Sequence, residues 1–366
     1  MNRHGVERAG LPAATAFSLA IDAAALAHDR RGMGRLVRGA VRVFARDPGL
    51  RLTLLAARRS ARTLADEFPG IVVQPAATAR RAGRYDAVWF PFNGMRFVPA
   101  APAVVTMHDA FAFTQPHPER IARFREQAPM RRAARRAARI AVDSQWTYAE
   151  VVRELRPARC EPVVIAPVPD AFFFPAPDDS PPPPLDALPF VLLVGVREPR
   201  KNASMALAAC ARALRGAETL VIVGQLSPHD RELAQRSGLR CGEIAASDGV
   251  LRALYRNAAL VLVPSLAEGF GLIAVEALAC GVPVLASSTT ALPQATGGAA
   301  LLLDPHDAAL WARKIRMLLD EPERAAQLRA RARAQFARSD REAFARATLA
   351  LLRESASTAL RNRRHQ

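Results

Sequence analysis

The chain has 366 residues, half of them hydrophobic and 23% charged, which is typical of about two globular domains and excludes a disordered or fibrous protein. The net charge is +17, but only Lys201 and Lys314 are lysines, so the excess is arginine and says little about partners by itself. Its distribution is uneven: residues 1–174 carry 27 basic and 15 acidic side chains, residues 175–323 carry 13 and 16, and residues 324–366 carry 11 and 3.

The four cysteines are isolated in the sequence, at Cys160, Cys210, Cys241 and Cys280, and none belongs to a Cys-x-x-Cys pair. This spacing argues against a zinc site and a disulfide framework, and it favours a reducing compartment. No segment of the sequence approaches the roughly 18 unbroken apolar residues that a membrane-spanning helix needs. We therefore predict a cytoplasmic protein whose membrane contact, if it has any, is peripheral and on the inner face.

Short apolar segments alternate with helical stretches along the first half of the chain, as in a parallel sheet with crossover helices. The predicted strands are Phe17–Ile21, Leu52–Leu55, Ala87–Phe90, Val104–Met107, Ile140–Val142 and Val163–Ala166. The segment Pro175–Pro189 then brings seven prolines, four of them consecutive. It predicts a semi-rigid extended linker, because proline fits neither a helix interior nor a central strand.

The alternation resumes after the linker, with strands predicted at Phe190–Val194, Leu220–Val223, Leu260–Val263 and Val282–Leu285. After Asp304 the pattern is purely helical and ends in a long helix over 341–361. The sequence thus predicts an α/β protein of two doubly wound, Rossmann-like domains. The first domain spans 1–174, the linker 175–189 and the second domain 190–340, and the helix within 341–366 is expected to pack back on the first domain.

The first motif is Gly32-Met33-Gly34-Arg35, between a predicted strand and the amphipathic stretch Leu36–Phe44. Glycine at Gly34 lets backbone approach a ligand, and the amides at a helix start can bind an anion or a sugar hydroxyl. The motif lacks the third glycine of a dinucleotide fingerprint, so a simple tight turn is an equal alternative.

An arginine-rich segment, Met130–Ile140, follows. At about 100° per residue, one arc of roughly 140° collects Arg131, Arg132, Arg135, Arg136 and Arg139. The opposite side holds Ala133, Ala134, Ala137, Ala138 and Ile140, which can pack on the sheet. Such a face predicts contact with an anionic membrane surface or a lipid-diphosphate acceptor. The alternative is a solvated helix face in an arginine-rich chain.

The third motif is Arg200-Lys201-Asn202, which follows the predicted strand Phe190–Val194 and precedes a helix. Two adjacent cations at a helix entrance suit a diphosphate. The lysine is informative in a chain that almost always uses arginine, because lysine supplies a compact point charge. The alternative is a solvated cation pair at a helix start.

The fourth motif runs from Pro264 to Ala277 and contains Glu268 and Glu276, eight positions apart. Gly269 and Gly271 form the turn after a predicted strand, and the amides of the helix that starts there can bind phosphate. Glu276 lies in an apolar helix, where a carboxylate is costly to bury without partners such as the two hydroxyls of a ribose. A carboxylate favoured by the helix dipole is the alternative, and it suits Glu268 better than Glu276.

Together these motifs resemble the retaining family 4 glycosyltransferases, which have the GT-B fold. The stretch Glu268-Gly269-Phe270-Gly271 to Glu276 resembles the family's E-x7-E signature, and Arg200-Lys201-Asn202 its phosphate-binding segment. The loop Gly32–Arg35 resembles the first-domain glycine loop, and His108-Asp109 resembles the HD pair. Asp143-Ser144 matches a short acidic or serine loop. The resemblance covers roughly residues 17–320, with the four main elements in the family's order.

The resemblance implies two domains facing a central cleft, and it implies roles residue by residue. Arg200 and Lys201 would neutralise the donor diphosphate, Glu276 would hold the ribose, and Glu268 would contact the transferred sugar. His108 would approach that sugar from the first domain. Phosphate or sugar would meet the amides of Phe270, Gly271 and Leu272, with Gly34 also on the donor side. In many members an arginine directly follows the glycine of the strand; here Val196 follows Gly195 and the arginine is Arg197, so its contact with the diphosphate is open.

The resulting hypothesis is a hexosyltransferase that moves a sugar from a nucleotide diphosphate sugar to a hydroxyl of a glycan or lipid-linked acceptor, with retention. No metal or cofactor is expected, because cations and helix amides balance the diphosphate. The turn 197–202 resembles a subgroup rich in mannosyl- and rhamnosyltransferases. Alternatives are a GT-B-like sugar epimerase, an inactive scaffold, or a basic nucleic-acid-binding protein. The chain has only three Trp and three Tyr, which is too few for a basic surface interleaved with aromatics and argues against nucleic-acid binding. No nucleic-acid partner is therefore predicted.

Overall fold

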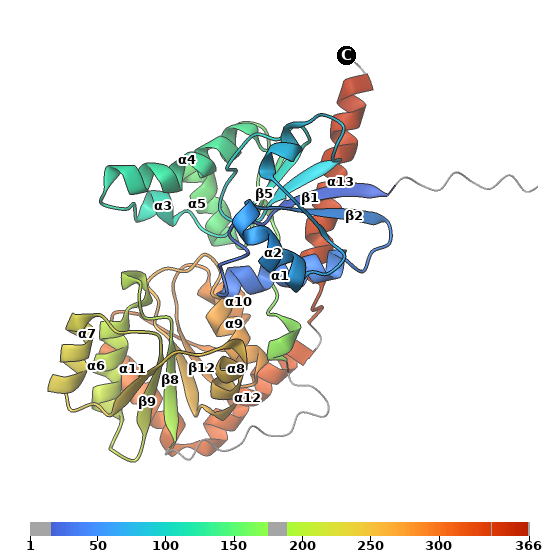
Figure 1. The fold of residues 1–366 in the computed structure, drawn as a ribbon. Helices are drawn as coiled ribbons and strands as arrows, with labels where there is room; N and C mark the ends of the chain where they lie inside the picture. Colours follow the sequence, from blue (N-terminus) through green and yellow to red (C-terminus); the bar gives the residue numbers. More distant parts are fainter. Residues whose placement is uncertain (1–15, 175–188, 338, 365–366) are drawn as a thin grey trace, which may run out of the picture.

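The computed structural model describes residues 16–174, 189–337 and 339–364, so nearly all of the predicted linker lies outside the described residues. Two parallel β-sheets, each covered by helices, form an upper and a lower domain (Figure 1). The first sheet has the order β3-β2-β1-β4-β5-β6-β7, and the second has the order β10-β9-β8-β11-β12-β13. The predicted α/β class with two doubly wound domains is confirmed.

In the first domain the strands are β1 (Phe17–Asp22), β2 (Leu50–Leu55), β3 (Val72–Gln74), β4 (Ala87–Phe90), β5 (Ala103–Met107), β6 (Arg139–Val142) and β7 (Val163–Val164). The helices are α1 (Gly32–Phe44), α2 (Arg58–Glu67), α3 (Phe111–Thr114), α4 (Arg120–Arg136) and α5 (Gln145–Leu155), with the short 3₁₀ turn η1 (Ala76–Arg80). The next 3₁₀ turn, η2 (Ala171–Phe173), already packs on the second domain through Phe173. Apolar side chains of α1 pack on one face of the sheet, and those of α4 and α5 pack on the other.

In the second domain the strands are β8 (Phe190–Val194), β9 (Thr219–Val223), β10 (Cys241–Ile244), β11 (Leu260–Val263), β12 (Val284–Ser287) and β13 (Leu301–Leu303). The helices are α6 (Ala203–Ala213), α7 (Pro228–Arg236), α8 (Asp248–Asn257), α9 (Leu272–Ala279), α10 (Leu292–Thr296), α11 (Ala308–Asp320) and α12 (Pro322–Ala337), with the 3₁₀ turn η3 (Pro199–Lys201). One core lies under α6 and α11, and the other under α8 and α9.

Strand order reverses beside the first strand of each sheet, between β1 and β4 and between β8 and β11. Loops that leave the carboxyl ends of strands at such a point form a crevice, which is where doubly wound folds bind ligands. The glycine loop Gly32–Gly34 follows β1, and His108 directly follows β5. Arg200 and Lys201 follow β8, and Glu268 follows β11. The sheet order therefore carries the predicted motifs of both domains to the same region between them.

The last helix, α13 (Ala343–Arg364), returns to the first domain after α12 has finished the second. Phe344, Leu351 and Leu352 are buried in the same core as α1 and the strands β1 and β4. In Figure 1 this helix runs in red beside the blue strands of the upper domain. The chain thus passes between the domains twice, once between β7 and η2, since Phe173 of η2 lies in a core of the second domain, and once between α12 and α13.

All ten predicted strands begin and end within two residues of the observed ones. The strands β3, β10 and β13 were not predicted. All three are edge strands; β3 and β13 are only three residues long, and β10 contains a glycine and a glutamate. The prediction for 282–285 began two residues early, since β12 spans Val284–Ser287. The helical arc drawn through residue 139 was wrong: α4 ends at Arg136, and Arg139 is the first residue of β6.

Candidate active site

The turn between β11 and α9 is shaped by glycine. Gly271 caps α9 with φ of +103°, and a Cβ there would lie 2.6 Å from a Leu292 methyl group, so a side chain is disfavoured on both grounds. The first turn of a helix leaves its amides without intrahelical partners. The predicted ligand amides of Phe270, Gly271 and Leu272 therefore lie at the start of α9, in a geometry that can receive an anion.

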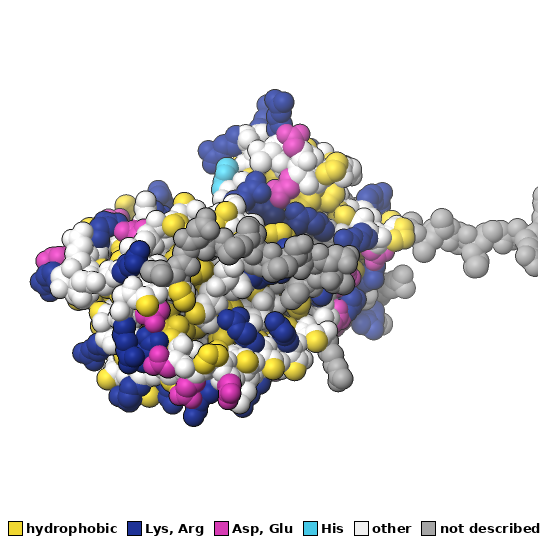
Figure 2. Space-filling view, turned by 90° about the horizontal axis from the view of Figure 1, so that it is seen from below, with side chains coloured by type: hydrophobic (Ala, Val, Ile, Leu, Met, Phe, Trp, Pro, Cys, Tyr) yellow, Lys and Arg dark blue, Asp and Glu magenta, His cyan; other side chains and the backbone are white. Residues whose placement is uncertain are grey.

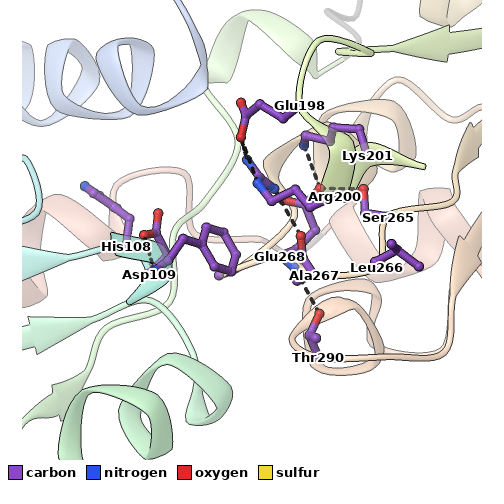
Figure 3. Close-up of polar contacts among 12 residues, drawn as sticks. His108, Asp109, Glu198, Arg200, Lys201, Ser265, Leu266, Ala267, Glu268 and Thr290 are labelled. Carbon is purple, nitrogen blue, oxygen red and sulfur yellow. Dashed lines mark hydrogen bonds and ion pairs between the residues drawn. The ribbon is translucent and has the colours of Figure 1, made fainter. Parts of the chain in front are cut away.

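Glu268 is the centre of a buried ion cluster in the second domain (Figure 3). Its carboxylate accepts hydrogen bonds from Lys201 Nζ at 2.6 Å, Arg200 Nη1 at 2.9 Å and Ser265 Oγ at 2.7 Å. Its backbone amide donates a hydrogen bond to Thr290 Oγ1 at 3.0 Å. Burial raises the pKa of Glu268, but Lys201 and Arg200 outweigh this effect and hold the pKa below its ordinary value. The structure thus brings together three of the predicted site residues, with Glu268 ionised.

Glu276 is 2% exposed and lies one turn into α9. Its carboxylate binds a residue of the other domain: Arg35 Nη2 donates a hydrogen bond to Oε1 at 2.5 Å. Arg35 belongs to the first turn of α1, and its Nη1 donates to Asp248 Oδ1 at 2.9 Å. The sequence motif contained Arg35, but no role was predicted for it. A pairing across 241 positions leaves no local signal in the sequence.

The glycine loop of the first domain is tightly packed. A Cβ at Gly34 would lie 2.0 Å from the Asp29 carbonyl oxygen, and one at Gly32 would lie 3.0 Å from Leu272 Cδ1. Gly32 therefore brings the start of α1 against the start of α9. Gly34 is required by the turn itself, which agrees with the tight-turn alternative, and the donor-side role predicted for it remains a prediction.

His108 is 4% exposed, and both of its ring nitrogens have partners in the first domain. Nδ1 lies 2.7 Å from Asp143 Oδ2, and Nε2 lies 2.7 Å from the Pro91 carbonyl oxygen. Both partners accept, so both ring nitrogens donate and the imidazole is protonated. Burial lowers the pKa of His108, but Asp143 and the Pro91 carbonyl outweigh it and raise the pKa to about 9. A side-chain contact with a sugar would require one of these bonds to break.

Asp109 and Phe111 are first-domain residues that sequence reasoning did not assign, although Asp109 belongs to the quoted HD pair. The Arg200 guanidinium lies 4.7 Å from the centroid of the Phe111 ring, so the cation of the second domain rests on an aromatic of the first. Burial raises the pKa of Asp109, and Arg200 opposes this effect. In Figure 3 His108 and Asp109 approach from one side and Arg200 and Lys201 from the other.

The domains also meet at Gly269, directly beside Glu268. A Cβ built on Gly269 would lie 1.8 Å from the His108 carbonyl oxygen, so any larger residue would force the two backbones apart. The Gly269 carbonyl accepts from Ser144 Oγ at 2.6 Å and from Thr147 Oγ1 at 2.9 Å. Ser144 also caps α5. These bonds fix the turn that carries the fourth motif against the first domain.

Two of the remaining predicted features lie outside this cluster. Arg197 donates to Gln225 Oε1 at 2.9 Å and lines a pocket of about 410 Å³ with Gly224 and Glu243, at the carboxyl ends of β9 and β10. Arg132, predicted on an exposed face, donates to the carbonyls of Met95 and Arg96. Arg131, Arg135 and Arg136 are exposed on α4.

On the face of the molecule seen in Figure 2, the surface charge is mixed. The face of the molecule seen from below carries acidic side chains between its basic ones (Figure 2). Among the described residues, no group of three or more His, Cys, Asp or Glu side chains has the geometry to hold a metal ion. Within the same residues, no helix combines the length and the hydropathy needed to cross a bilayer.

Comparison with known proteins shows what these features are similar to. Residues 179–335 match the family model described as "Glycosyl transferases group 1". The chain is 32% identical to O-antigen chain mannosyltransferase B of Escherichia coli over 243 residues, which are 60% of this chain and 62% of that protein. It is 39% identical to D-inositol 3-phosphate glycosyltransferase of Mycolicibacterium smegmatis over 161 residues, 40% of this chain and 36% of that protein. The matches thus span less than two thirds of each of these relatives.

The whole architecture is similar to that of solved glycosyltransferases. The crystal structure of Anabaena HepE in complex with UDP and glucose matches with a TM-score of 0.69 at 18% identity, covering 92% of this chain and all of that one. At this identity the match shows the fold and no more. The chain therefore has the GT-B fold, and within its second domain it is similar to the group 1 glycosyl transferases.

Proposed function

We propose that this protein transfers a hexose from a nucleoside diphosphate sugar to a hydroxyl of an acceptor, with retention at the anomeric carbon. The observation that carries the proposal is the convergence of Arg200, Lys201 and Glu268 beside the amides at the start of α9. Two cations and a helix start can stabilise a departing diphosphate. Retention rests on the resemblance to the family 4 enzymes.

The donor lies along α9 in this proposal. Arg200, Lys201 and the amides of Phe270, Gly271 and Leu272 bind the diphosphate. Glu276 accepts the two ribose hydroxyls, and the ionised carboxylate of Glu268 accepts hydroxyls of the transferred sugar. When the donor enters, its phosphates compete with Glu268 for the two cations, which frees Glu268 to accept from the sugar. Catalysis then consists of positioning the two substrates and stabilising the leaving group.

The first domain supplies the acceptor side and excludes water. Asp109 and Phe111 face Arg200 across the interface, so they lie where the sugar leaves the donor. His108 contributes as a buried cation that holds this loop through Asp143 and Pro91, rather than through the direct sugar contact that the resemblance implies. A cleft closed in this way limits hydrolysis of the donor.

The identity of the donor is tested first. Thermal shift and calorimetric titration with GDP, UDP, ADP and dTDP, followed by the matching sugar donors, should show one preferred nucleotide and hydrolysis or transfer of one sugar. The mannosyltransferase relative favours mannose as the transferred sugar, and the HepE complex with UDP and glucose favours a UDP-sugar. Equal, weak responses to all four would indicate a nucleic-acid binder or a scaffold. Interconversion of a free donor without transfer would indicate an epimerase.

The acceptor is proposed to be a glycan or lipid-linked molecule at the inner face of an anionic membrane. The first-domain helix α4 presents Ile121 and Phe124, 70% and 68% exposed, together with Arg131, Arg135 and Arg136. Apolar side chains flanked by arginines suit an anionic bilayer surface, where each cation contributes up to about 1 kcal/mol.

Cosedimentation with vesicles tests this surface. Binding should rise with the content of anionic lipid and fall with salt, and it should be largely lost in an Arg131→Ser/Arg135→Ser/Arg136→Ser variant. Arg132 is left unchanged because it holds the loop at Met95 and Arg96. A variant with three arginines of α7 and α8 changed to serine (Arg231, Arg236 and Arg256) is the charge-matched control. Vesicle binding that survives in the α4 variant would show this face to be solvated.

A further inference from the structure

Arg35 lies in the interface between the domains, and the proposed function assigns it no role. It stands at the start of α1, and its guanidinium is divided between two carboxylates of the second domain, Glu276 at 2.5 Å and Asp248 at 2.9 Å. The guanidinium carbon lies 5.1 Å from the centroid of the Phe173 ring. The Arg35 side chain is 13% exposed and that of Glu276 is 3% exposed, so water scarcely screens the pair.

The pair leaves Glu276 with acceptor capacity to spare. Arg35 occupies only Oε1, and the Tyr255 hydroxyl lies at 3.5 Å from Oε2. An ionised carboxylate offers about four lone-pair sites, so two ribose hydroxyls can still be accepted beside these contacts. The guanidinium and the ribose are therefore compatible partners of the same carboxylate.

Glu276 needs a cation to stay ionised at this depth. The groups that face it are Arg35 of α1 and Asp248 and Tyr255 of α8. Among them Arg35 is the cation, and Asp248 opposes it. Burial raises the pKa of Glu276 even with Arg35 present, because the desolvation outweighs the guanidinium. Removal of Arg35 would raise this pKa further.

We propose that Arg35 is a positioning residue for the donor: from the first domain it keeps the ribose-binding carboxylate of Glu276 ionised and oriented, so that nucleotide affinity depends on domain closure. This inference rests on the proposed function, in which Glu276 binds the ribose. It gives the glycine loop of the first domain a role in donor binding through a side chain rather than through its backbone.

The test is calorimetric titration of the full chain with GDP, UDP, ADP and dTDP, using the one that binds the wild type best, at about pH 6 and about pH 8. The wild-type to variant ratio at each pH removes the nucleotide's own titration. Arg35→Ala should lose about tenfold or more in affinity at the lower pH and about threefold or less at the higher pH, since only the ionised form of Glu276 is fully effective. Arg35→Lys should restore most of the affinity at both pH values.

Two further variants make the result specific. Asp248→Asn removes the other partner of Arg35 and should leave nucleotide affinity within about threefold of wild type, because the Glu276 contact remains. In Glu276→Gln, which cannot ionise, the loss should be the same at both pH values. The proposal is overturned if Arg35→Ala binds nucleotide as well as or better than the wild type, or if it loses the same factor at both pH values. The first result would make Arg35 a competitor of the ribose, and the second would make it a structural residue.

Failure of this inference can be separated from failure of the proposed function. If Glu276→Ala binds nucleotide as well as the wild type, Glu276 does not bind the ribose, and the proposed role of Arg35 is rejected together with that assignment. The same holds if the wild type binds none of the four nucleotides. If Glu276→Ala loses affinity while the Arg35→Ala ratio is flat with pH, the donor site stands and only the role of Arg35 is rejected.

Discussion

The two acidic residues of the fourth motif are stabilised in different ways. Glu268 receives its cations, Arg200 and Lys201, from its own domain, whereas Glu276 receives Arg35 from the other. The pKa of Glu268 is lowered because two cations outweigh burial, and that of Glu276 is raised because burial outweighs one. The phosphate end of the proposed donor site is therefore assembled within the second domain, and the ribose end is complete only when the domains meet.

The largest effect is expected where the domains touch most closely. Gly269→Ala places a Cβ where the His108 carbonyl oxygen now lies, 1.8 Å away, so the domains must separate. A displacement of about 1 Å at a reaction centre can cost about a hundredfold, and we expect a loss of that order in kcat. Steady-state kinetics with the preferred donor is the measurement. Unchanged kcat would mean that the domains are further apart during turnover.

Glu276→Ala should weaken nucleotide binding by about a hundredfold, because it removes two charge-assisted hydrogen bonds, each of which contributes at least about 1.5 kcal/mol. Glu268→Ala should lower turnover more than affinity, since its proposed partner is the transferred sugar. Calorimetric titration with the free nucleoside diphosphate, paired with kinetics, separates the two. Equal losses of affinity in both variants would contradict the division between the two ends of the site.

His108 makes the first-domain side of the interface sensitive to pH. Its pKa is raised from 6.5 to about 9 in the folded chain, so the stabilisation is complete below pH 6.5 and is lost as pH rises through about 9. The free energy of unfolding should fall by about 3 kcal/mol over this range through His108 alone. Denaturant titrations of the wild type and His108→Gln provide the comparison. A variant with the same pH dependence as the wild type would assign the change to other groups.

Lys201→Ala should reduce donor affinity by about tenfold, because a compact charge beside the diphosphate is lost. Lys314→Ala is the matched control, since Lys314 is the other lysine of the chain and lies on α11, away from Glu268. Donor titrations of both variants decide the point. Matching affinities would mean that the phosphate site has been placed wrongly.

The sequence predicted the second-domain end of the site better than the interface. Lys201 and Glu268 belong to motifs whose spacing reports local geometry, and both lie in the cluster around η3 and the β11–α9 turn. The pairing of Arg35 with Glu276 and the enclosure of His108 by Asp143 and Pro91 depend on how separate segments pack, which no spacing reveals. The same limit explains α4: periodicity showed an arginine-rich face but not that Arg132 would turn to the Met95 carbonyl.

The packing of α13 on the first domain constrains the order in which the two domains can fold during synthesis. The second domain is finished once the ribosome has passed α12, but the first lacks Phe344, Leu351 and Leu352 until α13 emerges. Domains usually fold in the order in which they are made. Here part of the apolar face of the N-terminal sheet stays uncovered until α13 has been translated. A chain truncated after residue 337 is therefore expected to retain a folded second domain and an incompletely folded first domain that is prone to aggregate.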